Sequence, residues 1–133
     1  MATTIDDLVA RMCKLEHWSS SQTGPGWAIE IPQPKGRSQT VYASIVMDGS
    51  DALVRYVSMI GDSDQIDDRR AKMALELNSK MPHGCLAIHN GQLVVTETRP
   101  LHTTTPESSG TAVKYIALQA DTYERLIYGS DKH

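Results

Sequence analysis

The chain has 133 residues, of which 40% are hydrophobic and 22% are charged, and its formal net charge is -3. This length and composition are typical of one globular domain, so residues 1–133 are treated as a single domain. The mild acidity argues against a nucleic-acid surface, and no apolar run approaches the roughly 20 residues that span a bilayer.

The first predicted element is an amphipathic helix over residues 4–16. Ile5, Leu8 and Met12 recur at helical spacing, and Thr4 can cap the N-terminus. The polar segment 19–26 is rich in Ser, Gly and Pro, so we expect a loop there.

Three strands are predicted next, over residues 27–32, 39–47 and 52–60. Side chains that favour burial alternate with others along each segment, as in half-buried strands. Short turns separate the segments, which favours an antiparallel meander. Pro32 cannot donate to a strand ladder, so the first strand either ends there or lies at a sheet edge.

A second helix is predicted to run to about Lys80, with Ser63 or Asp64 as its alternative N-terminal caps. The apolar stripe of this helix consists of Ile66, Met73 and Leu77. Its acidic beginning is expected from the positive end of a helix dipole.

The strongest local signal is a hairpin over residues 85–89 and 92–98. Its turn is Asn90-Gly91, and both residue types tolerate the positive φ that a tight hairpin turn requires. The last helix is expected from Thr105-Pro106 to about Tyr128, with Gly129 as its C-terminal cap. The predicted fold is therefore α+β, in the order α-βββ-α-ββ-α, with helices packed on one antiparallel five-stranded sheet.

This order and the segment 77–101 resemble the type III secretion chaperone-like superfamily, which includes small secretion chaperones and YbjN-type proteins. The motifs that carry the resemblance are Leu77-Asn78, Met81-Pro82-His83-Gly84, Asn90-Gly91-Gln92-Leu93-Val94-Val95 and Arg99-Pro100-Leu101. The resemblance implies a homodimeric, non-enzymatic binding protein of the bacterial cytoplasm. In the chaperone branch, the dimer holds an extended segment of a partner protein in apolar grooves and by strand addition.

The resemblance also directs attention to two sets of residues. The candidate partner-binding residues are Met12, Trp18, Trp27 and Met47. The candidate dimer-interface residues are Ile66, Met73 and Leu77. Methionine adapts to varied partners, although the residues taken one by one favour a core position for the methionines and for Trp27.

Two alternative functions remain open. One is a YbjN-type regulatory or adaptor protein, which would bind a folded partner through one compact patch rather than an elongated apolar strip. The other is a small enzyme whose catalytic partners meet only in the folded chain.

Metal and cofactor motifs are weak. His83, Cys85 and His89 form His-x-Cys-x3-His, but in a strand Cys85 and His89 lie about 13 Å apart, too far for one zinc ion without strong bending. The acidic run at 62–68 lacks the glycine and glutamate of a calcium-binding loop. We therefore expect no metal, no cofactor and no catalytic residues.

The N-terminus and the cysteines favour a cytoplasmic protein. Asp6 and Asp7 stand where a signal peptide carries positive charge. Cys13 and Cys85 lack the paired spacing of a disulfide framework, so we expect reduced thiols.

Overall fold

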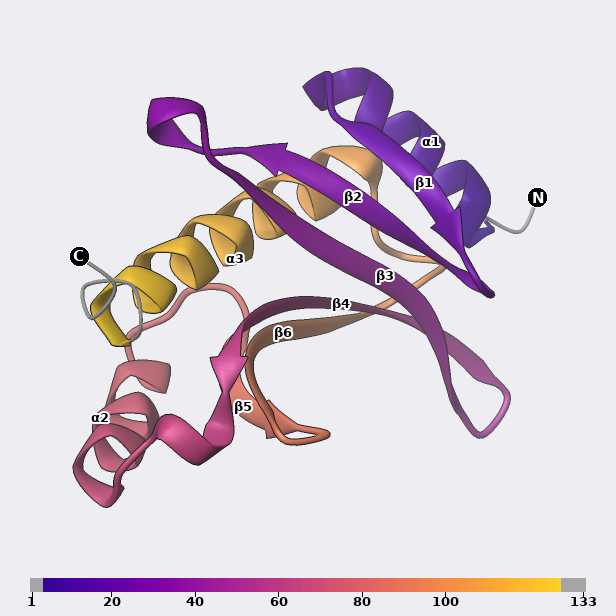
Figure 1. Cartoon of the computed structure of the whole chain (residues 1–133). Coiled ribbons are helices and arrows are strands. Elements are labelled where there is room, and N and C mark those ends of the chain that lie inside the picture. Colours follow the sequence, from indigo (N-terminus) through magenta and orange to yellow (C-terminus); the bar gives the residue numbers. More distant parts are fainter. Residues whose placement is uncertain (1–3, 128–133) are drawn as a thin grey trace.

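The computed structural model describes residues 4–127, which form an α+β domain built on one antiparallel sheet (Figure 1). The helices are α1 (Ile5–Glu16), α2 (Asp68–Asn78) and α3 (Pro106–Ile127), with short 3-10 turns η1 (Pro34–Gly36) and η2 (Ser63–Gln65). The strands are β1 (Ser19–Thr23), β2 (Gly26–Pro32), β3 (Ser38–Asp48), β4 (Asp51–Asp62), β5 (Cys85–His89) and β6 (Gln92–Pro100). Their order in the sheet is β1-β2-β3-β4-β6-β5, so β1 and β5 are its two edges.

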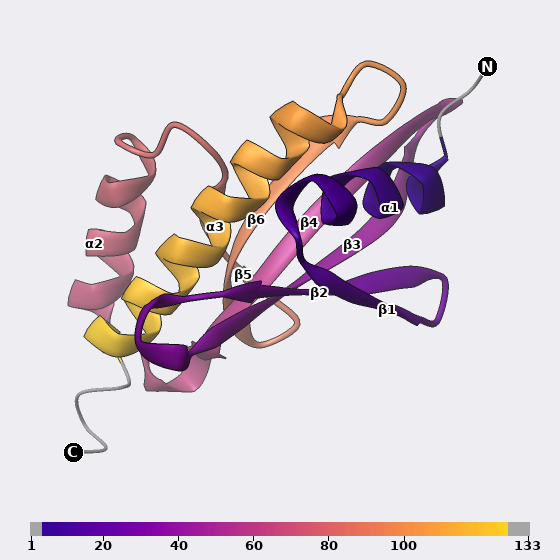
Figure 2. The same ribbon diagram turned by 90° about the horizontal axis from the view of Figure 1, so that it is seen from above.

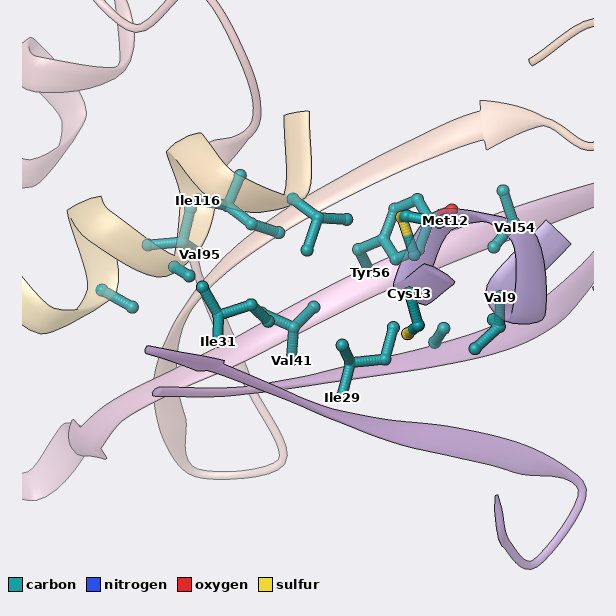
Figure 3. Close-up of a cluster of buried hydrophobic side chains, with 14 of the residues drawn as sticks. Val9, Met12, Cys13, Ile29, Ile31, Val41, Val54, Tyr56, Val95 and Ile116 are labelled. Atoms are coloured by element: carbon teal, nitrogen blue, oxygen red, sulfur yellow. The ribbon is translucent and has the colours of Figure 1, made fainter. Parts of the chain in front are cut away.

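The core lies between one face of the sheet and two helices. α1 packs against β1, β2 and β3, whereas α3 packs against α1 and against β3, β4 and β6 (Figures 1 and 2). Alternation along the strands supplies the sheet side of this core, with Ile29 opposite Val41 and Ala43 opposite Tyr56 (Figure 3). α2 instead lies beside β5 and contacts this core only at its margin, through the partly buried Ala74 and Leu77.

The predicted first helix is confirmed, including its cap. The Thr4 hydroxyl accepts a hydrogen bond from the Asp7 backbone N–H at 3.1 Å, which satisfies one of the free donors at the helix N-terminus. His17 ends the helix at φ 63°, and the Trp18 N–H then donates to the Cys13 carbonyl at 3.0 Å. This turn directs the chain into β1.

The sheet has six strands, so the expectation of five was wrong. The missed strand is β1, which lies in the segment 19–26 that we expected to be a loop. All five of its side chains are exposed, so it buries nothing that a hydrophobic pattern could reveal. It is held by antiparallel pairing with β2, where Ser21 lies opposite Ala28.

The second helix starts later than predicted. Its N-terminal cap is Asp67, whose carboxylate accepts from the Arg70 N–H at 2.8 Å, rather than Ser63 or Asp64. Ser63 instead opens the turn η2, because the Asp62 carboxylate accepts from the Asp64 N–H at 3.2 Å. Several acidic residues in this segment can cap a helix, and the sequence alone did not distinguish among them.

The predicted hairpin is confirmed. Asn90 and Gly91 both have positive φ, and they connect β5 to β6 with His89 opposite Gln92. α3 begins at Pro106 and continues to the end of the described residues, whereas the expected cap Gly129 lies outside them. Among residues 4–127, no helix is both long and apolar enough to cross a bilayer.

Candidate protein-binding surface

An apolar groove runs between α2 and β5 and encloses about 230 Å³. Ala71, Ala74 and Leu75 line it from the helix, and Leu86 and Ile88 line it from the strand. The i, i+3 and i+4 spacing of the helical residues places them on one face of α2. We call this feature the α2–β5 groove.

The residues around this groove leave much apolar surface open. α2 has no buried residue, whereas α1 buries five. The exposed fraction is 71% for Leu75 and 63% for Ile88. An amphipathic helix normally buries its apolar face. The apolar side chains that α2 leaves exposed are therefore typical of a surface that contacts another molecule.

Asn78 determines how much of the β5 edge is available. Its side-chain amide donates to the Leu86 carbonyl at 3.2 Å, and its carbonyl oxygen accepts from the Leu86 N–H at 2.6 Å. Both backbone groups of Leu86 therefore point away from β6 and are already satisfied. Backbone direction alternates along a strand, so the N–H and C=O of Ile88 also point outward, and no side chain like Asn78 caps them in the described residues.

The predicted dimer-interface residues occupy different positions around this surface. Ile66 lines the groove, and Met73 is exposed on α2 without lining it. Leu77 is partly buried against the core. Sequence reasoning missed Leu75 and Ile88, although the Ala71-Leu75 spacing in a helix and the placement of Ile88 in an edge strand could have indicated them.

The four predicted partner-binding residues do not form one surface. Met12 is fully buried between α1 and the sheet, so it belongs to the core and is withdrawn as a contact residue (Figure 3). Trp27 is half-buried against the core, and its indole N–H donates to the Asp6 carboxylate at 2.7 Å. Met47 is exposed at the end of β3, whereas Trp18 precedes Ser19, which is aligned through Glu30 of β2 with Thr40 near the start of β3.

The β1 edge is a second open feature. Its five residues carry no charge and no proline, although sheet edges are usually protected by lysine, proline or a covering element. Trp18 lies just before this strand and lines a hollow of about 340 Å³ with His17, Glu30 and Arg37. The described residues thus place one of the predicted tryptophans next to an unprotected edge.

A polar chain connects the core to the surface near the start of α3. The Tyr56 hydroxyl donates to Ser109 Oγ at 3.0 Å, and the Ser109 and Thr104 hydroxyls lie 3.0 Å apart. Arg99 Nε donates to Thr104 Oγ1 at 3.0 Å. Burial raises the pKa of the Tyr56 hydroxyl, an effect that the hydrogen bond with Ser109 partly offsets.

Glu97 continues this chain into a polar hollow of about 410 Å³. It accepts a hydrogen bond from Arg99 Nη1, and its other oxygen lies 3.8 Å from His83 Nδ1. The His83 ring also meets the Tyr115 ring edge-on, with centroids 5.6 Å apart. These contacts connect the segment before β5 to β6 and to α3, which is a structural role.

The His-x-Cys-x3-His residues do not converge. Cys85 lies opposite Thr96 and His89 lies opposite Gln92, at the two ends of β5, whereas His83 faces Glu97. In the part of the chain that the structure describes, no three histidine, cysteine, aspartate or glutamate side chains could together hold a metal ion.

Comparisons with known proteins add no relative. No protein-family model matches the chain. No curated protein matches it either.

Proposed function

We propose that this chain is a homodimeric protein-binding module that holds a segment of a partner polypeptide. The proposal is based on one observation: two exposed surfaces, the α2–β5 groove and the β1 edge, lie at opposite edges of one sheet. The α2–β5 groove is apolar with an edge largely closed, and the β1 edge is polar with an unprotected backbone.

The α2–β5 groove is assigned to the second copy. Side chains as exposed as Leu75 and Ile88 favour contact with an apolar surface, because burying apolar area is worth about 25 cal/mol per Å². The bonds from Asn78 to Leu86 leave little free backbone for an extended peptide on this side. Packing of side chains, rather than a long strand pairing, is therefore the expected mode of contact.

The β1 edge is assigned to the partner polypeptide. Strand addition derives affinity from backbone hydrogen bonds, and specificity from pockets beside the edge. The exposed backbone of β1 supplies the first feature, and the hollow beside Trp18 supplies the second. This arrangement suits a segment that remains extended when it is bound.

The experiment isolates the tagged chain from its own host, identifies retained proteins by mass spectrometry and sizes the complex by light scattering. Limited proteolysis then maps the protected part of the partner. The wild-type chain is expected to form a two-copy core with one partner protected over a short segment. Replacing Ser19 and Ser21 by lysine protects the edge and should abolish partner retention without altering the dimer.

Ser50→Lys is the control, because Ser50 lies in the exposed β3–β4 turn and the variant adds a lysine away from both features. It should retain the partner. Partner retention that survives the double lysine variant would contradict the assignment of β1. A protected footprint spread over a whole folded domain would instead favour the adaptor alternative.

A further inference from the structure

We infer that two copies join through a single reciprocal backbone bridge at Ile88, with the two-fold axis passing beside this residue. The inference rests on the proposed homodimer and adds its register. It follows from which backbone groups of β5 are free and which are satisfied.

The tight turn at Asn90-Gly91 makes His89 and Gln92 a hydrogen-bonded pair, and alternation then directs every second residue of β5 toward β6. Leu86 and Ile88 are the outward-facing residues of the strand. Asn78 occupies both backbone groups of Leu86. Ile88 is therefore the one residue of β5 with an outward N–H and C=O that Asn78 does not occupy.

This pattern discriminates between two occupants of the edge. An extended peptide that pairs along β5 requires successive outward residues, and it would have to displace Asn78 from Leu86. A second copy related by a two-fold axis requires only Ile88, because its N–H donates to the C=O of the partner's Ile88 and the reverse bond forms by symmetry. The observed edge suits the second copy.

Side chains near the bridge support the same occupant. Ile88 lines the α2–β5 groove, so a bridge at this position brings two such grooves together and covers apolar surface that is now open.

Disulfide trapping tests the register. Residues that form a hydrogen-bonded antiparallel pair have Cα atoms about 5.5 Å apart, within the range that a disulfide spans. In a Cys85→Ser background, Ile88→Cys is expected to yield a cross-linked dimer on mild oxidation, as read on a non-reducing gel. Ala87→Cys is the matched control, because a bridge at Ile88 sets it opposite the partner's His89.

The sizes of the uncross-linked proteins separate the possible outcomes. A dimer by light scattering that cross-links through Ile88→Cys and not through Ala87→Cys supports the bridge. A dimer that cross-links through neither variant, or equally through both, overturns the register but leaves the proposed homodimer intact. A wild-type monomer at about 100 μM, far above a micromolar dissociation constant, overturns the bridge and the homodimer together.

Leu75→Glu provides a second measurement that does not depend on cysteine chemistry. α2 buries no side chain, so this variant is expected to fold and to be monomeric. Ser50→Glu adds the same charge in the β3–β4 turn and should remain dimeric. A dimeric Leu75→Glu variant would count against a bridge that brings the two α2–β5 grooves together.

Discussion

The Arg37 guanidinium makes a two-pronged contact with the Asp121 carboxylate. Nε donates to Oδ1 at 3.2 Å, and Nη2 donates to Oδ2 at 2.9 Å. Asp121 has only 5% of its side chain exposed, and it raises the pKa of Arg37 through this hydrogen bond. The pair connects the turn before β3 to α3, two segments that are 84 positions apart in the chain.

Asp121→Asn should lower the thermal stability of the chain. It removes the charge that satisfies Arg37 and leaves a weaker acceptor in a nearly closed site. We expect the Tm to fall by about 5 °C or more in calorimetry. Arg125→Gln is the control, because Arg125 lies 3.6 Å from the same carboxylate but is 55% exposed, and it should change the Tm by less than about 2 °C.

Tyr56→Phe should weaken the dependence of stability on alkaline pH. Burial raises the pKa of Tyr56 above its ordinary value near 10, so the unfolded phenol ionises while the folded phenol stays protonated. The unfolded state then binds fewer protons, and the free energy of unfolding falls as the pH rises above about 10. The variant lacks this contribution.

Urea titrations between about pH 8 and pH 11 measure this difference as slopes of unfolding free energy against pH. Above about pH 10, the slope of the variant should be shallower than that of the wild type. Part of the slope that remains in the variant comes from Tyr123, because burial raises the pKa of this residue too. At neutral pH, loss of the Tyr56 bond to Ser109 should cost about 0.5–1.5 kcal/mol. Identical alkaline slopes would show that Tyr56 ionises equally in both states.

Gly84→Ala should be far more costly than the same change at Gly49. Both glycines have positive φ, which costs a residue with a Cβ about 1–2 kcal/mol. At Gly84 the added Cβ would also lie 2.9 Å from Ile116 Cγ2 and 3.0 Å from the Thr96 carbonyl, whereas at Gly49 nothing lies within 4 Å. Chemical denaturation should show a loss at Gly84 at least about 1 kcal/mol larger than at Gly49.

The two cysteines should react at very different rates in the native protein. Cys85 is exposed, whereas Cys13 is buried and its thiol pKa is raised by that burial, an effect that a hydrogen bond with Ser20 partly offsets. Brief treatment with iodoacetamide should modify Cys85 and spare Cys13, as seen by peptide mass mapping. Denaturant should make both reactive, and rapid native labelling of Cys13 would contradict its place in the core.

Patterns that depend on burial or on turn chemistry were read correctly from the sequence. Ile29 and Val41 alternate because one face of their strands packs on helices, and Asn90-Gly91 tolerates the backbone of the hairpin turn. These signals depend on neighbouring residues in the chain, so they were sufficient to predict most of the helices and strands and the antiparallel sheet. The strand β1 was missed because its five side chains are polar and exposed, so no hydrophobic alternation marks it.

The candidate surface was harder to predict because exposure depends on which elements meet. Met12 and Leu75 are both apolar helical residues, yet one is fully buried and the other is 71% exposed. The difference arises because α1 packs on the sheet and α2 lies beside β5, a placement that helical spacing does not encode. Likewise, the bond between Asn78 and Leu86 joins residues whose proximity depends on the packing of α2.

The complete exposure of β1 has a consequence for how such a domain can diversify. All five of its side chains are exposed, and Ser20 contacts a core residue through its hydrogen bond with Cys13, so substitutions at the other four positions should leave folding almost unchanged while altering the chemistry displayed along an open backbone. At most positions in a small domain, a substitution that alters the binding surface also lowers the stability of the fold. At these four positions of β1, this trade-off is nearly absent, and new specificities can be sampled on an unaltered scaffold.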